Sequence, residues 1–356
     1  MRKTKIWLIS GCTLFAASFL LMMTARNIEG FAQWYATTIY PVLVQSIGGL
    51  SGLVPFSVVE ILLYIAIILF LMLFGRLIIG LIKKSKDKRT ACQFGAGLFL
   101  SAGILFFMYV INCGINYQRD SFSECIGLEV EEYTVEDLKK VCQILTEDIN
   151  ERAQVVERDD QGLMLLPEKE NKLAVQAMKA LAEDYDEMEG YYPQPKGLLG
   201  SWILSVQQLT GVYSPFTIEA NYNQAMTAYN IPFTMCHELS HLRGFMQEQE
   251  ANFIAYLACM ESENVEFQYS GSMLGWINCT NVLYEWDREA WMEVREMLDE
   301  NVLADLQANN EFWAKYDGEV AEVADIVNDN YLKANGQADG VKSYDRMVDL
   351  LVAYYR

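Results

Sequence analysis

The segment NIPFTMCHELSHLRGFMQEQEANFIAYLAC, residues 230–259, contains both histidines of this 356-residue chain. Pro232 suits the first turn of a helix, and Gly244 suits its C-terminal end. On that helix His237 and His241 are four residues apart, so both imidazoles project from one face about one turn apart. The spacing predicts that the two side chains bind a single metal ion.

Glu238 follows the first histidine directly. Its side chain is rotated away from the shared face by one residue, so it lies beside the metal, where a carboxylate can accept a proton from bound water. Zinc suits this arrangement, because it accepts nitrogen and carboxylate ligands and lowers the pKa of bound water to about 7. The alternative is a pair of structural histidines on the surface or in the core.

A third metal ligand has to be a carboxylate, because the chain has no other histidine. Glu248 and Asn252 share one face of the next helix, whereas Glu250 points to about the opposite side. One residue of such a pair binds the metal, and the other holds a ligand histidine by its second ring nitrogen. The two residues therefore need to share one face of the helix. This selects Glu248 as the ligand and Asn252 as its support. Glu250 is the alternative ligand, and a solvated acidic helix face is the alternative to a site.

The composition excludes two classes of protein. The chain is 52% hydrophobic and 21% charged, which excludes a disordered chain. A formal net charge of -20 argues against nucleic-acid binding, which needs a basic surface. Residues 1–118 carry ten Lys and Arg against three Asp and Glu, whereas residues 119–356 carry 17 against 44. We therefore expect a basic, apolar membrane anchor over 1–118 and an acidic domain over 119–356.

Three stretches of the first part are long and apolar enough to cross a bilayer: about 6–23, 56–77 and 94–115. Each comes close to the roughly 20 helical residues that cross a hydrocarbon core of about 30 Å. The alternative is that they are core helices of a soluble domain. Three such stretches around the cationic run KKSKDKR, residues 83–89, favour membrane spans.

The basic residues predict the orientation of the spans. Three of them precede the first stretch: Arg2, Lys3 and Lys5. Because Lys and Arg collect on the cytoplasmic side, these residues and the run 83–89 place the N-terminus in the cytoplasm and the 119–356 domain outside. The first stretch could also be a cleaved signal peptide, which leaves the acidic domain outside as well. Aromatic residues in the segment 27–55 are expected to be interfacial anchors: Trp34, Tyr35 and Tyr40.

The acidic part is expected to be mainly α-helical with a little β-structure, an α+β arrangement. Apolar periodicity and capping residues predict helices over 134–150, 172–184, 271–284, 288–300, 302–316, 320–332 and 341–355. The sequence SPFTIEANYN, residues 214–223, is rich in β-formers and predicts a strand. Its edge could bind an extended peptide by strand addition, with an ordinary internal strand as the alternative.

The eight cysteines do not form a pattern typical of a disulfide framework or of a thiolate zinc site, since no CxxC occurs. Most are expected to be small buried side chains. A disulfide between Cys125 and Cys142 is compatible with an oxidising compartment, although the spacing does not demand it.

HELSH followed by EQEAN and an apolar helix resembles the gluzincin class of zinc metallopeptidases. The resemblance implies that the downstream helix supplies a glutamate ligand four residues before an Asp or Asn, which corresponds to Glu248 and Asn252. Almost the whole chain resembles a bacterial membrane family catalogued as domain of unknown function 3810, through IYPVL, VPFSVVEIL, PFTIEANYN, IPFTMCHELSHLRGF and YLKANGQADGVKSYDRMVDLL. This second resemblance implies a zincin-like domain behind a three-span anchor and names no substrate.

We therefore expect a membrane-anchored zinc metalloendopeptidase that hydrolyses peptide bonds outside the cytoplasmic membrane, with the bilayer and a peptide or protein substrate as partners. Zinc would be held by His237, His241 and Glu248, and Glu238 would take a proton from water and pass it to the leaving amine. Three residues are candidate donors to the transition-state oxyanion: Tyr331, Tyr344 and Arg346. The alternative is a non-catalytic membrane receptor or assembly protein whose metal is structural or absent.

Overall fold

The computed structural model describes residues 2–84 and 88–356. The chain divides into two compact units. Unit 1 consists of Met1–Arg119 and Ser214–Ile218, and unit 2 consists of Asp120–Tyr213 and Glu219–Arg356. A short loop from the middle of the acidic part is therefore included in unit 1, with the apolar helices.

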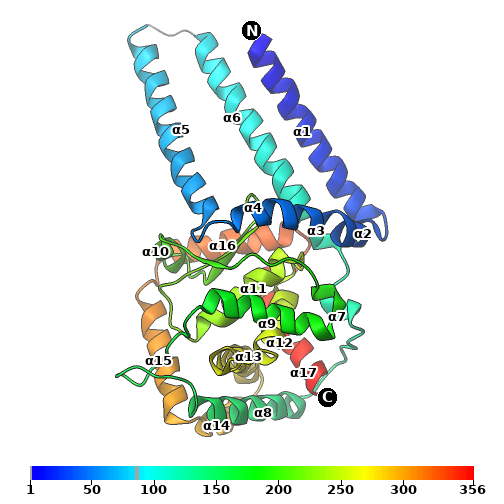
Figure 1. Cartoon of the computed structure of the whole chain (residues 1–356), viewed down its shortest axis with the longest axis vertical. Coiled ribbons are helices and arrows are strands. Elements are labelled where there is room, and N and C mark those ends of the chain that lie inside the picture. Colours follow the sequence, from blue (N-terminus) through cyan, green and yellow to red (C-terminus); the bar gives the residue numbers. More distant parts are fainter. Residues whose placement is uncertain (1, 85–87) are drawn as a thin grey trace. The chain divides into compact units, whose positions relative to one another are not determined.

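Within the described residues, three helical segments of unit 1 are apolar enough to cross a membrane: α1 (Arg2–Asn27), α5 (Val58–Ile82) and Lys88–Gln118, which begins with α6 (Lys88–Tyr109) (Figure 1). The first and third segments contain the predicted stretches 6–23 and 94–115, whereas α5 begins two residues after the start of the predicted stretch 56–77 and ends five residues beyond it. The 25 residues of α5 are about 37 Å long, more than the roughly 30 Å of a hydrocarbon core. Only 11% to 17% of their most apolar stretches is buried, so they are not core helices of a soluble domain. The protein is therefore associated with a membrane.

Small side chains that recur every seven residues bring α1 and α6 together along their length (Figure 1). These buried residues are Gly11, Ser18 and Ala25 on α1, and Ala96 and Gly103 on α6. The two backbones approach so closely that a Cβ atom added at Gly103 would lie 3.3 Å from the carbonyl oxygen of Gly11. The rings of Phe15 and Phe99 pack beside this contact, with centroids 5.3 Å apart.

Gly103→Leu tests this packing. We expect the larger side chain to force the two helices apart and to destabilise unit 1 by about 1 to 3 kcal/mol. The measurement is the thermal unfolding midpoint of the full chain in detergent. Gly75→Leu is the matched control, because a Cβ atom at Gly75 in α5 meets nothing within 4 Å. Equal midpoints for the two variants would contradict close α1–α6 packing.

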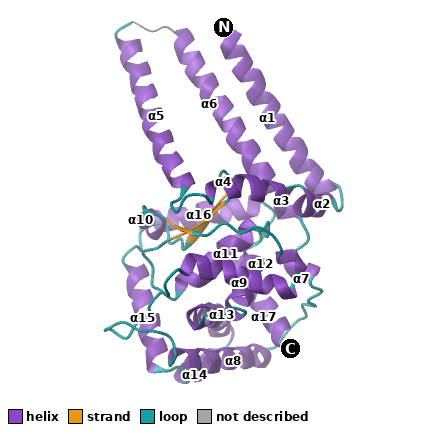
Figure 2. Ribbon diagram, in the orientation of Figure 1, coloured by secondary structure: helices purple, strands orange, loops and turns teal. Residues whose placement is uncertain are grey.

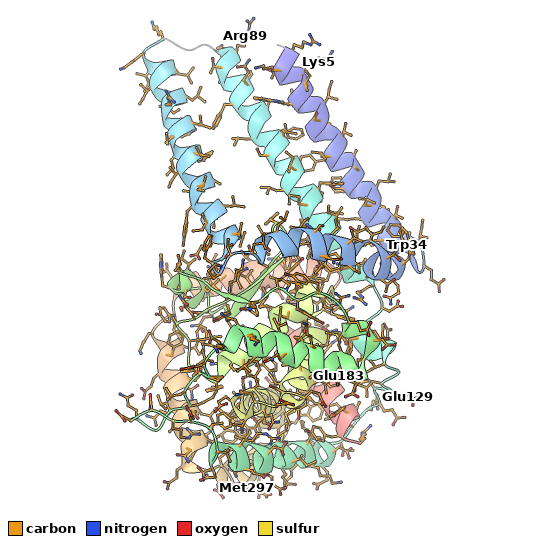
Figure 3. All side chains as sticks on the ribbon, viewed as in Figure 1. Lys5, Trp34, Arg89, Glu129, Glu183 and Met297 are labelled. Carbon is orange, nitrogen blue, oxygen red and sulfur yellow. The ribbon has the colours of Figure 1, made fainter. Side chains whose placement is uncertain are left out.

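Short helices lie across one end of the spans in unit 1 (Figure 1). They are α2 (Phe31–Thr38), α3 (Tyr40–Leu43) and α4 (Gly49–Ser51), with a π-helical turn at Val44–Gly48. Figure 3 shows Trp34 at this end and Lys5 and Arg89 at the other. Trp34 is exposed, as expected of an interfacial anchor, whereas Tyr35 and Tyr40 are buried and do not fit that expectation.

Unit 2 is built around α13 (Val265–Trp286), which contacts α8 (Val135–Ala153), α11 (Asn230–Leu242) and α12 (Glu248–Met260). Figure 1 shows α13 nearly end-on. The helix α8 begins at the predicted place, because the Thr134 and Asp137 side chains cap its first turn reciprocally. Its buried residues recur every three or four positions: Leu138, Val141, Cys142, Leu145, Thr146, Ile149 and Ala153.

Further helices complete unit 2: α7 (Phe122–Cys125), α9 (Glu170–Asp184), α10 (Ser201–Ser205), α14 (Arg288–Glu296), α15 (Glu300–Ala314), α16 (Glu319–Ala334) and α17 (Met347–Tyr355). Two predicted helices differ from the structure. The one over 288–300 ends early, because Asp299 caps a new helix by accepting a hydrogen bond from the Asn301 amide. The one over 341–355 begins as a 3₁₀ helix, Gly340–Arg346, and becomes α-helical at Met347.

The predicted strand over 214–223 is wrong in its extent. The chain forms two short strands instead, β2 (Gly211–Ser214) and β3 (Glu219–Tyr222), separated by a turn (Figure 2). Pro215 has no amide hydrogen to donate and Ile218 has a φ of 50°, and both features interrupt a strand. The strand order is β1-β3-β2, and β1 (Lys196–Gly197) runs parallel to β3. The central strand is therefore β3, and β2 forms the edge.

The predicted alternative of a Cys125–Cys142 disulfide is also wrong. Both cysteines are free thiols. Cys142 is buried on α8 and hydrogen-bonded to Cys279 of α13, whereas Cys125 is only partly buried at the end of α7. Cys125 and Cys142 are therefore in different surroundings, and the Cys142 thiol already has Cys279 as its neighbour.

Candidate metal centre

The helix α11 carries both histidines on one buried face, as predicted from their spacing. Pro232 lies in its first turn, and the helix ends at Leu242, just before Gly244. The imidazole centroids of His237 and His241 are 4.6 Å apart, with the rings nearly perpendicular. Both side chains are mostly buried, at 12% and 10% exposure. The helix therefore holds two nitrogen donors at a fixed separation.

The chain reverses directly after α11 and brings a carboxylate back to the histidines. Gly244 has a φ of 100°, a conformation that favours glycine, and α12 begins four residues later at Glu248. Its Oε2 atom lies 3.3 Å from His237 Nε2 and 3.5 Å from His241 Nε2. The three ligand atoms all lie within 4.8 Å of one another, close enough to hold one metal ion. The structure thus brings together the three residues that the sequence indicated.

A backbone carbonyl fixes which nitrogen of His241 faces the centre. The Nδ1 atom lies 2.8 Å from the carbonyl oxygen of Phe245. Because a carbonyl only accepts, Nδ1 carries the hydrogen, and Nε2 of the neutral ring presents its lone pair to Glu248. The Oε2 atom of Glu248 has no well-aligned hydrogen bond. Lone pairs from an imidazole and a carboxylate therefore converge in a buried space, an arrangement that requires a proton or a cation between them.

The electrostatics of the centre favour positive charge. Burial alone would raise the pKa of the Glu248 carboxyl, but the two histidines outweigh it and hold that pKa far below its usual value. Burial would likewise lower the pKa of His241, yet the nearby Glu248 carboxylate raises it to about 9. An anionic carboxylate facing two imidazoles is suited to binding a divalent cation.

Glu238 lies next to this centre, and its carboxyl has a raised pKa. Its side chain is buried, and this burial, reinforced by Glu248 and opposed by the histidines, raises its pKa to about 7. The Oε2 atom has no hydrogen-bond partner within the described part of the chain. Gly211, the first residue of β2, leaves room for it, because a Cβ atom there would lie 2.5 Å from Glu238 Oε1.

The alternative ligand, Glu250, is bonded elsewhere. Its carboxylate accepts hydrogen bonds from the Ser123 amide at 2.9 Å and from the Ser123 hydroxyl at 2.8 Å. Glu250 therefore connects α12 to the start of α7, whereas Glu248 is the glutamate of α12 that faces the histidines.

Four further residues were predicted to assist the centre, one as a support for a ligand histidine and three as oxyanion donors. Asn252 is buried one turn after Glu248 and was expected to orient a ligand histidine. Among the described residues, it is the Phe245 carbonyl that orients His241, through its Nδ1 atom. Arg346 is exposed and paired with Asp339. Tyr331 is exposed on α16. The side chain of Tyr344 lies outside the part of the chain that is described.

A family match covers most of both units. The family described as "Protein of unknown function (DUF3810)" matches residues 35–352. The chain belongs to this family. The match confirms the resemblance to this family. It also includes the four residues of the candidate centre: His237, Glu238, His241 and Glu248. No curated protein and no solved structure matches the chain.

Sequence reasoning about this DUF3810 chain missed three residues that shape the centre. Gly211 is 27 positions from Glu238, and no local pattern connects the two. Phe245 contributes through its backbone, which its side-chain type does not reveal. Ser123 is 127 positions from Glu250, and no local pattern connects the two.

Glutamine substitutions distinguish the two glutamates of α12. We expect Glu248→Gln to weaken zinc binding to the full chain by more than about 100-fold, because it removes an anionic oxygen from the centre. Glu250→Gln should retain zinc and lower the stability of unit 2 by about 1 to 3 kcal/mol, because a Ser123 donor loses its acceptor. Elemental analysis after zinc titration and thermal unfolding measure the two effects. The reverse pattern would make Glu250 the ligand.

Proposed function

We propose that the protein is a membrane-anchored zinc metallopeptidase. The observation that carries the proposal is that Glu248 Oε2 lies 3.3 Å from His237 Nε2 and 3.5 Å from His241 Nε2, with the buried Glu238 carboxyl beside them. Two imidazole nitrogens and one carboxylate oxygen are a ligand set of catalytic zinc sites. The likeness of HELSH and EQEAN to gluzincins supports the same reading.

The residues present fit a zinc ion. The converging lone pairs of His241 and Glu248 need a proton or a cation between them, and Phe245 holds His241 in the tautomer that directs Nε2 inward. When bound, zinc would supply a Lewis acid that acidifies water and polarises the scissile carbonyl group. Glu238 would take the proton from the attacking water on its free Oε2 atom and return it to the leaving amine.

The edge strand β2 offers a place for an extended substrate. The prediction placed this edge in residues 214–223, but β3 is central, so the edge next to the centre is β2. Its first residue, Gly211, borders Glu238. A peptide that adds to β2 by main-chain hydrogen bonds would pass beside the Glu238 carboxyl.

Charge supports an extracytoplasmic location of the centre. Lys5 and Arg89 lie at the same end of α1 and α6 (Figure 3). The positive-inside tendency assigns that end to the cytoplasm, so α6 leaves the bilayer on the outer side and unit 2 follows it. The middle of the cationic run 83–89 lies outside the described residues, and the described Lys83, Lys84, Lys88 and Arg89 carry this inference.

The decisive experiment compares the full chain in lipid nanodiscs with its Glu238→Gln variant. We expect both to bind one zinc ion, measured by elemental analysis, and wild type to cleave members of a peptide library in a zinc-dependent way. Glu238→Gln should lower cleavage by about 100- to 10,000-fold, because the proton acceptor is lost. Glu261→Gln, an exposed glutamate at the end of α12, is the control and should cleave like wild type.

Two outcomes would contradict the peptidase proposal. One is a wild-type chain that binds no zinc. The other is a zinc-bound chain whose cleavage of peptides is the same with Glu238 and with Gln at that position. Either would favour the receptor or assembly protein, in which the metal is absent or structural.

Gly211→Ala tests the room beside the proposed proton acceptor. The new Cβ atom would displace the Glu238 carboxyl, so we expect zinc binding to be retained and cleavage to fall by about 10-fold or more. Gly318→Ala is the control, because a Cβ atom there meets nothing within 4 Å. The same zinc titration and cleavage assays apply, and wild-type cleavage by Gly211→Ala would show that this glycine has no positioning role.

A further inference from the structure

The helix α16 displays its apolar side chains outward. Four of them are between 56% and 62% exposed: Val320, Val323, Ile326 and Val327. The inward side of the helix is formed by partly buried small and polar residues and by the fully buried Leu332; the partly buried ones are Ala321, Ala324, Asn328 and Asp329. An ordinary surface helix has the opposite arrangement, with its apolar face on the core. The outward residues, here called the α16 stripe, therefore lack a covering surface in unit 2.

Both ends of α16 are fastened, so the α16 stripe cannot simply rotate inward. Just before the helix, Asp317 accepts a hydrogen bond from Gln208 Nε2 at 3.1 Å. Just after it, Gln337 Nε2 donates to Gln249 Oε1 at 2.9 Å. Asp329 on the inward side also accepts from the Val341 amide. The orientation that exposes the stripe is thus held by polar contacts.

A second apolar group belongs to the segment that is fastened to α16. Trp202 and Leu199 are 63% and 70% exposed, in and just before α10. This segment continues to Gln208, the partner of Asp317. Tryptophan is enriched where proteins meet the headgroup region of a bilayer. The hydrogen bond between Gln208 and Asp317 therefore connects the segment of Trp202 to the α16 stripe.

Unit 2 cannot leave the neighbourhood of the bilayer. The third apolar segment ends at Gln118 and α7 begins at Phe122, so almost no linker separates the span from unit 2. The chain returns to unit 1 at Ser214–Ile218, where the Asn112 side chain donates to the Pro215 carbonyl at 2.7 Å. A tether this short keeps the local concentration of membrane surface high, so weak docking suffices.

We propose that the α16 stripe and Trp202 dock unit 2 onto the bilayer surface, with the apolar side chains in the boundary between headgroups and acyl chains. Burial of apolar area would drive this docking. The exposed charged residues of α16 are mainly acidic, with Glu319, Glu322 and Asp325 against Lys333. This charge favours a zwitterionic surface over an anionic one and opposes pairing of two α16 helices from separate copies.

The test uses the full chain in nanodiscs of zwitterionic phospholipid that contain a lipid with a photoactivatable acyl chain. We expect crosslinks, located by mass spectrometry, in 319–334 and in the peptide of Trp202 as well as in the spans. Val323→Glu combined with Val327→Glu should lower crosslinking in 319–334 by about tenfold, because two apolar side chains that the bilayer would bury are lost. Adding anionic phospholipid should also lower crosslinking in 319–334, because α16 is acidic, and should leave crosslinking in the spans unchanged.

Glu322→Gln combined with Asp325→Asn is the matched control on exposed polar positions of the same helix and should crosslink at least as well as wild type. Thermal unfolding of all variants shows that unit 2 remains folded. Wild-type crosslinks confined to residues 2–118 would overturn the proposal, because the α16 stripe would then face water. In a parallel reaction with a protein–protein crosslinker, crosslinks between α16 helices of two copies, together with a lack of lipid crosslinks in 319–334, would also overturn it and assign the stripe to a copy interface.

Discussion

The candidate metal centre depends on one backbone constraint, the left-handed residue Gly244 between α11 and α12. The reversal there lets Glu248 meet two histidines that lie only seven and eleven residues earlier in the sequence. It also leaves the Phe245 carbonyl in reach of His241, so the same turn that supplies the carboxylate orients an imidazole. Any larger side chain at Gly244 would strain the backbone at the point where both functions originate.

Three neighbouring glutamates show how environment divides one chemical group into three roles. Burial raises the pKa of Glu238 to about 7, while two imidazoles hold that of Glu248 far below its usual value against the same burial. Glu250, also buried, has a raised pKa despite its hydrogen bonds from Ser123. Composition alone treats these residues as equal members of an acidic chain. Their surroundings make one a candidate base, one a candidate ligand and one a structural acceptor.

What the sequence predicted well rests on short periods. Four-residue spacing placed His237 and His241 on one face, the reciprocal caps of Thr134 and Asp137 located α8, and long apolar stretches located the spans. What it did not predict depends on contacts between distant segments. The approach of Gly211 to Glu238 and the bond of Ser123 to Glu250 leave no trace in local spacing. The division of the strand over 214–223 follows from a turn that is included in unit 1.

The scarcity of histidine has a practical consequence. Both imidazoles of the chain lie in the candidate metal centre, and their rings are in contact with each other. Any spectroscopic signal specific to imidazole, such as a histidine side-chain resonance in nuclear magnetic resonance, therefore originates from this one place in a protein of 356 residues. The centre carries its own built-in reporter, and its occupancy can be followed in the intact membrane protein without an introduced label.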